Sequence, residues 1–170
     1  IDYHDNEWGK PVKDDKILFE FLILESFQAG LSWFTILKKR ENFREAFANF
    51  DVKKVANFDE EKVEELVLNA GIIRHRGKIN AAINNAKLFI KIQKEYGSFS
   101  DFIWEYVNHQ PIVNHWNSIK EVPATTEISD KLAKYLKKRG FKFFGSTTIY
   151  AHMQATGMVN DHTLDCFCRK

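Results

Sequence analysis

Glu25 and Trp33 are the first residues in this 170-residue sequence whose types and spacing could do chemistry. Glu25 lies near the middle of an apolar arc of the helix predicted over residues 15–28, and burying an unpaired carboxylate is costly. Glu25 could form an ion pair with an Arg or a Lys, or it could cap the helix near its end. Alternatively, it could be a hydrogen-bond acceptor on the wall of a pocket. Trp33, in the first turn of the next predicted helix, would add a stacking face. Together they suit a planar, amine-bearing heterocycle.

A second group is the turn Gly140–Gly145 between two predicted helices. A glycine-bounded turn that opens a helix exposes backbone N–H groups, and the helix dipole adds partial positive charge there. Such a turn could hold a DNA phosphate without reading the base sequence. An ordinary helical hairpin whose cations complement a helix C-terminus explains the same pattern equally well. The basic residues concerned are Lys134, Lys137, Lys138, Arg139 and Lys142.

A third group contains His162, Cys166, Cys168 and the distant His4. Imidazole and thiolate are good zinc ligands, and structural zinc is normally four-coordinate. Such a site would join the two ends of the chain. An exposed histidine and two small buried thiols would explain the same residues. Hydrolytic zinc is disfavoured because no His-Glu-x-x-His sequence is present.

The remaining candidates are less specific. Residues 74–78 form a second basic cluster, which is either a solvated turn or another phosphate contact. His109, His115 and His152 have no partner that the sequence reveals, and we interpret each as a structural histidine. The sequence contains no Walker loop, no Gly-x-Ser-x-Gly motif and no Rossmann fingerprint.

Helical periodicity dominates the elements that must position these residues. It predicts an all-α single domain over residues 1–170, with a loop-rich stretch at 108–126 and an irregular tail at 157–170. Capping residues and glycines set the expected boundaries. The predicted helices span residues 15–28, 33–47, 59–71, 77–96, 99–107, 129–139 and 146–156.

Composition limits the classes of protein that remain. Apolar residues make up 44% and charged residues 28%, which suits a globular chain and excludes intrinsic disorder. No apolar run approaches the ~20 residues that span a membrane. The net charge is only +2, so a nucleic-acid interface depends on local clusters. The two cysteines are one residue apart, which favours a reducing compartment, the cytoplasm. The dense stretch that begins at Ile1 leads us to expect further residues upstream.

Taken together, these motifs resemble the bacterial DNA-3-methyladenine glycosylase I family, in the helix-hairpin-helix superfamily of base-excision enzymes. The resemblance extends over essentially the whole chain, and its blocks occur in order. They are Tyr3–Gly9, Leu24–Trp33, Ile36–Glu41, Gly71–Lys78, Val107–Pro111, Lys137–Phe143 and Val159–His162.

The resemblance implies a helix-hairpin-helix bundle, with the hairpin at about residues 129–156 and zinc-binding ends at 1–9 and 157–170. It implies a monomeric, monofunctional hydrolase that flips 3-methyladenine out of alkylated double-stranded DNA and cleaves the N-glycosidic bond. No nucleotide cofactor or membrane is expected. A non-catalytic DNA-binding module and a glycosylase with a shifted base preference, reshaped by Phe27 and Phe34, are the alternatives.

The resemblance also implies roles for individual residues. Glu25 corresponds to the carboxylate that accepts a hydrogen bond from the exocyclic amine of the flipped base. Trp33 corresponds to the stacking platform, Tyr3 to a second polar contact, and Trp8 to a residue that helps to close the pocket. Three residues correspond to ligands of a structural zinc ion: His4, His162 and Cys166. The residues assigned to DNA contact are Gly30, Leu31, Gly140, Lys142, Gly145 and Ser146.

The sequence departs from this pattern in two respects. The family's fourth zinc ligand is a cysteine upstream of Ile1, so either this chain is a fragment of a longer one, or the site is incomplete and Cys168 or water fills that place. Many superfamily members also carry an aspartate after the hairpin, which this family lacks. We interpret Asp161 and Asp165 as groups around the zinc ligands or on the surface. No lysine has an evident pocket position, so β-lyase activity is not expected.

Overall fold

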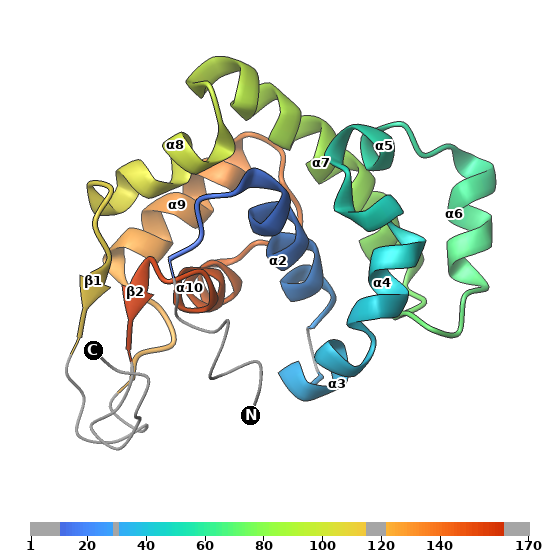
Figure 1. Cartoon of the computed structure of the whole chain (residues 1–170), viewed down its shortest axis with the longest axis horizontal. Coiled ribbons are helices and arrows are strands. Elements are labelled where there is room, and N and C mark those ends of the chain that lie inside the picture. The colour runs from blue at the N-terminus through green and yellow to red at the C-terminus, as the bar shows by residue number, and fades with distance from the viewer. Residues whose placement is uncertain (1–10, 29–30, 115–121, 162–170) are drawn as a thin grey trace.

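The computed structural model describes residues 11–28, 31–114 and 122–161, and these residues are mostly helical (Figure 1). This confirms the predicted helical class. The short strands β1 and β2 are parallel, with Ile112 opposite Val159. The elements are α2 (Asp15–Phe27), α3 (Trp33–Lys38), α4 (Arg40–Ala46), α5 (Val52–Ala56), α6 (Glu60–Val67), α7 (Arg76–Tyr96), α8 (Phe99–Trp104), β1 (Ile112–Val113), α9 (Glu127–Lys138), α10 (Ser146–Ala155) and β2 (Val159–Asn160).

Side-chain caps explain where several helices begin. The Asp14 carboxylate accepts the backbone N–H of Ile17 at 3.2 Å and starts α2. Asp59 caps α6 in the same way. Thr126 and Ser129 form a capping box, which starts α9 two residues earlier than the sequence predicts. None of the described helices combines the length and the apolar character that crossing a membrane requires.

Three local predictions are corrected. The helix expected over residues 33–47 is two helices, because the backbone leaves helical geometry at Lys39. The short helix α5, capped by Asp51, was not predicted. The tail was expected to be irregular, yet β2 pairs with β1 through the Ile112 N–H and the Met158 carbonyl. Such short elements depend on contacts between distant segments, which periodicity does not report.

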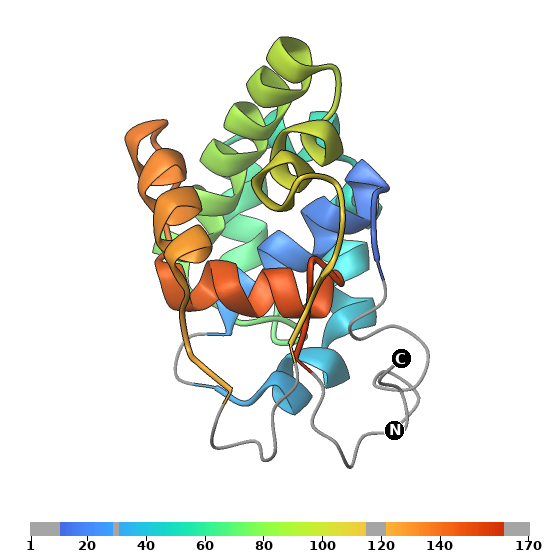
Figure 2. The same ribbon diagram turned by 90° about the vertical axis from the view of Figure 1, so that its left-hand side faces the viewer.

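Helix α2 lies at the centre of the molecule, as its nearly all-round apolar pattern predicts. Every residue from Leu18 to Phe27 is buried. Helices α7, α8 and α10 pack against it, and α10 in turn packs against α9 (Figures 1 and 2). The interior around α2 is rich in aromatic rings: Phe19, Phe27, Phe43, Phe47, Phe50, Phe89 and Phe99.

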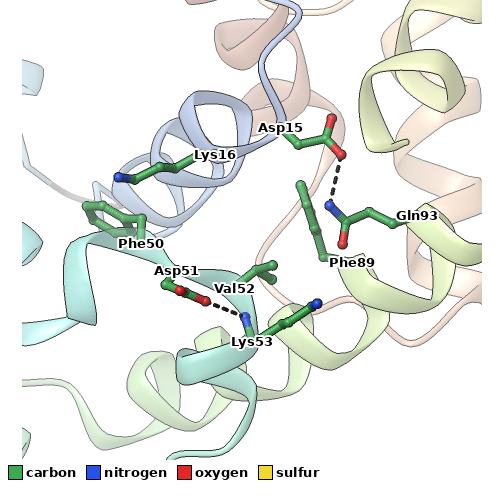
Figure 3. Close-up of a pocket in the computed structure, with 8 residues that line it drawn as sticks. All are labelled: Asp15, Lys16, Phe50, Asp51, Val52, Lys53, Phe89 and Gln93. Carbon is green, nitrogen blue, oxygen red and sulfur yellow. Dashed lines mark hydrogen bonds between the residues drawn. The ribbon is translucent and has the colours of Figure 1, made fainter. Parts of the chain in front are cut away.

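The carboxylate of Asp15 joins three helices at one end of α2. It accepts the backbone N–H groups of Phe99 and Ser100, at 2.9 and 2.8 Å, and the side-chain amide of Gln93 at 2.9 Å. These contacts border a hollow of about 370 Å³, in which Asp51 is used as the cap of α5 (Figure 3). The carboxylates of this hollow therefore serve the fold.

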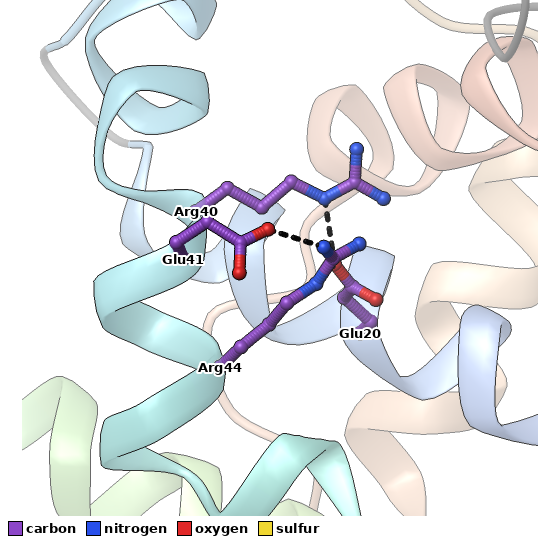
Figure 4. A network of polar contacts seen from close by, with 4 residues as sticks. All are labelled: Glu20, Arg40, Glu41 and Arg44. Atoms are coloured by element: carbon purple, nitrogen blue, oxygen red, sulfur yellow. Dashed lines mark hydrogen bonds and ion pairs between the residues drawn. The ribbon is translucent and has the colours of Figure 1, made fainter.

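Glu20 connects α2 to α4 through two arginines (Figure 4). Its Oε2 accepts from Nε of Arg40 at 2.7 Å and from Nε of Arg44 at 3.0 Å. Arg44 also contacts the exposed Glu41 at 2.5 Å. Glu20 is buried, so these contacts satisfy a charge that would otherwise be costly inside the protein.

Replacing Glu20 with Ala should therefore destabilise the protein by about 2–4 kcal/mol, because it leaves the largely buried Arg40 without this carboxylate. Urea unfolding would measure the change. The matched control is Glu41→Ala, which removes an exposed carboxylate on the same arginine network and should change stability little. Equal effects of the two substitutions would contradict the assigned role of Glu20.

Candidate functional site

The carboxylate of Glu25 is buried inside the protein and contacts a histidine from another helix. Glu25 lies near the C-terminal end of α2 and is 5% exposed. Its Oε1 is 2.8 Å from Nδ1 of His152 on α10, and the His152 side chain is fully buried. Neither predicted alternative, an Arg or Lys partner or a helix cap, describes this contact.

Two opposing effects act on the proton affinity of Glu25. Burial is the larger effect and raises the pKa of its carboxyl group, because the protein interior disfavours the charged form. The charge and hydrogen bond of His152 act in the opposite direction and lower that pKa. The net direction is upward, so His152 limits an increase that burial would otherwise make larger.

Trp33 packs on the same helix as Glu25. Its ring stacks on Phe21 with centroids 6.4 Å apart and 24° between the planes. Phe21 is four residues before Glu25, so the two lie on one face of α2, a turn apart. The Arg40 guanidinium lies 5.4 Å from the centroid of the Phe21 ring. The ring of Trp33 is therefore held against the turn of α2 that precedes Glu25.

The connection from α2 to α3 presents apolar side chains at the surface. Leu31 is 39% exposed, and its N–H is bonded to the carbonyl of Gln28 at 2.7 Å. Phe34 is 67% exposed, with the Lys38 amine 4.7 Å from its ring centroid. Exposed apolar side chains of this kind can enter a gap in another molecule. Phe27, in contrast, is buried in the core and packs against Phe43.

The turn between α9 and α10 is held in place by α7. The side chain of Asn85 bonds both the N–H and the carbonyl of Lys142, at 3.0 and 2.9 Å, and Asn84 donates to the carbonyl of Gly140 at 3.0 Å. Gly140 has φ +100° and Phe143 has φ +67°. A bulky residue seldom adopts such a φ, so the anchoring from α7 stabilises an unfavourable backbone.

The N-terminus of α10 opens onto a concave surface lined in part by Lys134, Lys137 and Lys142. No side chain caps this helix end, where Gly145 has an ordinary φ of −70°. A Cβ at Gly145 would meet no atom within 4 Å. The Ser146 hydroxyl is engaged internally, with contacts to Ser129 and Asp130. Backbone N–H groups and lysines are thus what this surface offers to an anion.

The basic cluster at residues 74–78 is not one uniform surface. Arg76 forms an exposed ion pair with Glu64, with contacts of 2.5 and 3.0 Å. Lys78 is buried, its amine lies 3.5 Å from the carbonyl of Phe27, and desolvation lowers its pKa. His75 is exposed and contacts the ring of Phe143 edge-on. This cluster therefore meets both the end of α2 and the turn before α10.

Several predicted site residues lie outside the described residues: Tyr3, His4, Trp8, Gly30, His162, Cys166 and Cys168. The segments leading to both ends of the chain are nevertheless connected, because the N–H of Val12 bonds the carbonyl of Thr156 at 2.8 Å. Within the described residues there is no group of three or more potential metal ligands.

Asp161 is buried and accepts hydrogen bonds from Asn114, Tyr150 and Gln154. This excludes a surface position for Asp161, which was one of the two interpretations drawn from the sequence. Its contacts connect the end of β2 to α10. Asp165 lies outside the described residues.

His152 was not predicted to be the partner of Glu25. A signal was available: Ile149, His152 and Met153 recur at helical spacing, which places the histidine on the apolar face of α10. Periodicity predicts the burial of that face but not the helix against which it packs. The anchoring role of Asn84 and Asn85 had no signal in the sequence.

Comparison with known proteins places this helical domain among the DNA glycosylases. Residues 1–169 match the methyladenine glycosylase family. DNA-3-methyladenine glycosylase 1 of Escherichia coli is 56% identical over 168 residues, 99% of this chain and 90% of its own length. The Haemophilus influenzae DNA-3-methyladenine glycosylase is 53% identical over 169 residues, 99% of this chain and 91% of its own length.

Solved structures agree with the sequence relatives. A crystal structure of 3-methyladenine DNA glycosylase I has a TM-score of 0.96 and 53% identity, covering 99% of this chain and 93% of its own. The Staphylococcus aureus enzyme, solved in a study of 3-methyladenine recognition, has a TM-score of 0.96 and 40% identity, covering 99% and 90%. The chain belongs to the methyladenine glycosylase family.

The raised pKa of Glu25 makes stability depend on pH. Between the ordinary value of 4.5 and the raised value, the folded protein binds a proton that the unfolded chain has released. Stability from this group is therefore lost as pH rises through that window. Glu25→Gln removes this titration, so wild-type stability relative to Glu25→Gln should fall as pH rises above about 4.5.

Urea unfolding of both proteins at several pH values would test this expectation. Glu41→Gln is the matched control, because it removes an exposed carboxylate and should show no such trend. A stability difference between wild type and Glu25→Gln that stays constant with pH would refute the assignment.

Proposed function

We propose that this protein is a monofunctional DNA glycosylase that releases 3-methyladenine from alkylated double-stranded DNA by hydrolysing its N-glycosidic bond. The observation that carries the proposal is the buried carboxylate of Glu25, which pairs with a histidine rather than with Arg or Lys. The family and its 3-methyladenine glycosylase relatives supply the substrate class. A module that only holds DNA has no need of such a carboxylate beside a stacking ring.

The chemistry of the substrate sets what the protein must do. Methylation at N3 makes the adenine cationic and therefore a good leaving group. The C–N bond breaks, the positive charge moves to the sugar, and water completes the hydrolysis. Glu25 accepts a hydrogen bond from the exocyclic amine of the base. The ring of Trp33 stacks on the base, and this stacking contributes about 1–3 kcal/mol. Extracting the nucleotide costs a few kcal/mol, least for a damaged base.

DNA contact is assigned to two surfaces. The turn Gly140–Gly145 and the uncapped N-terminus of α10 bind a phosphate through backbone N–H groups, as in a helix-hairpin-helix motif, with Lys142 adding positive charge. Gly30 and the exposed Leu31 fill the gap that the flipped nucleotide leaves. The protein acts as a monomer in the cytoplasm.

A structural zinc ion is proposed at the ends of the chain, with His4, His162 and Cys166 as ligands. Two imidazoles and a thiolate are a donor set that zinc prefers, and Cys168, an upstream cysteine or water completes it. The backbone hydrogen bond from Val12 to Thr156 supports this proposal, because it connects the segments that lead to the two ends of the chain. The ion would attach the C-terminal tail to the N-terminal segment and take no part in base removal. About one zinc per chain in unchelated protein supports the site, whereas its absence removes the proposal.

Incubating the protein with methylated DNA and identifying the released bases by chromatography tests the function. Wild type should release 3-methyladenine, and Glu25→Gln should release it about 10- to 100-fold more slowly, the loss of one hydrogen bond to a charged group. Glu41→Gln, at an exposed position, should match wild type.

Three results would contradict these assignments. If the wild-type protein binds DNA but releases no base, the protein is a DNA-binding module and not a glycosylase. Release of a different methylated base would mean a shifted preference. Full turnover and selectivity in Glu25→Gln would remove the role of Glu25.

The two turn glycines separate DNA contact from folding. Gly145→Ala should keep wild-type stability, since its φ is −70° and its Cβ meets nothing, yet weaken DNA binding about 10-fold if a phosphate approaches closely. Gly140→Ala should lower stability by about 1 kcal/mol, because φ is +100° there. Thermal unfolding and DNA titration at fixed salt measure both effects. Unchanged DNA affinity in Gly145→Ala would argue against the phosphate site.

A further inference from the structure

The second ring nitrogen of His152 has no role in the contacts described above. Nδ1 lies 2.8 Å from Oε1 of Glu25, and the side chain is fully buried. Nε2 is also buried, and no atom of the described residues is its hydrogen-bond partner. Buried polar atoms of side chains are seldom left without a partner. The burial of Nε2 without a partner therefore constrains where the hydrogens of Glu25 and His152 lie.

The pair can carry its hydrogens in three ways. If His152 is neutral with its hydrogen on Nδ1, it donates to an ionised Glu25, and Nε2 carries a lone pair and no hydrogen. If Glu25 is protonated and donates to Nδ1, the imidazole hydrogen is on Nε2. If both ring nitrogens are protonated, Nε2 again carries a hydrogen. The last two arrangements bury an N–H group without an acceptor, and orphaned buried N–H groups are rarer than under-satisfied acceptors. The first arrangement is therefore favoured.

We propose that His152 is a positioning residue for base removal, which donates its Nδ1 hydrogen to Glu25 and holds that side chain as an ionised acceptor for a positively charged purine. This inference rests on the glycosylase function proposed above. Oε1 is engaged by His152, which leaves Oε2 to accept from the amine of the base. A neutral His152 also leaves the negative charge of Glu25 uncancelled, which suits a cationic base.

The need for such a donor follows from the burial of Glu25. Burial favours the protonated carboxyl group, which accepts a hydrogen bond more weakly and offers no negative charge to a cationic base. His152 opposes this protonation through its hydrogen bond, which favours the ionised carboxylate. Among the described residues, Lys78 of α7 brings a cation to this end of α2, and its amine contacts the Phe27 carbonyl. Asp161, which faces α10 near β2, contacts Tyr150 and Gln154.

The backbone around His152 is well fixed, as a positioning role requires. The His152 carbonyl accepts from both the hydroxyl and the N–H of Thr156, at 2.7 and 3.0 Å. The carbonyl of Thr156 accepts from Val12, so the end of α10 is tied to the segment before α2. The imidazole is therefore carried on a helix end that is bonded on both sides.

The pH dependence of base release tests the inference. Because an ionised Glu25 accepts more strongly and stabilises a cationic base, single-turnover rates should fall on the acidic side as it gains a proton. His152→Leu removes the donor and should move this acid limb to higher pH. His152→Asn, whose amide can donate from near the Nδ1 position, should move it back toward wild type. His109→Leu is the matched control, because His109 is exposed, and it should leave the profile unchanged.

An acid limb of His152→Leu that coincides with wild type would overturn the proposal, even if the rate itself fell. No base release by wild type at any pH would instead overturn the glycosylase function, and the hydrogen positions would still be measurable.

A second measurement needs neither activity nor a substituted His152. Nitrogen NMR of the wild-type imidazole at neutral pH should show a hydrogen on Nδ1 of His152 and none on Nε2. Glu25→Gln should perturb the Nδ1 hydrogen signal, whereas Glu41→Gln should not. A hydrogen on Nε2 in the wild type, with or without one on Nδ1, would overturn the proposal.

Discussion

A buried carboxylate near the C-terminal end of the central helix is the constraint on which the rest of this structure depends. Glu25 is almost completely buried in α2, so its carboxylate needs a hydrogen-bond partner from another element. Helix α10, which packs against α2, supplies His152 as that partner. The same helix then continues to Thr156, whose carbonyl holds the segment that precedes α2.

The two buried glutamates of α2 have different kinds of partner. Glu20 contacts two arginines, which remain charged at any physiological pH, so its negative charge is cancelled within the fold. Glu25 contacts a histidine, which can donate a hydrogen bond while neutral. One carboxylate therefore stabilises the packing of α4, and the other keeps a charge that a cationic ligand can use. The surroundings, rather than the residue type, separate these roles.

Helix α10 connects the turn proposed to contact DNA to the site proposed for the base. Its uncapped N-terminus follows Gly145, and His152 lies six residues beyond Ser146, about 9 Å along the helix axis at 1.5 Å per residue. Asn84 and Asn85 of α7 hold the turn at the start of this helix. A phosphate bound at the turn and a base beside Glu25 would thus be positioned by one short rigid element.

The helical class, most helix boundaries, the turn at Gly140–Gly145 and the central position of α2 could all be predicted from the sequence. These features follow from local patterns of apolar residues, glycines and caps. The sequence also singled out Glu25 as a buried carboxylate and Trp33 as a nearby ring. Three contacts could be identified only from the folded protein: His152 with Glu25, the Trp33 ring with Phe21, and the Asn85 side chain with the backbone of Lys142. Those contacts join residues far apart in the chain, and helical periodicity reports which face of a helix is buried but not which helix covers it.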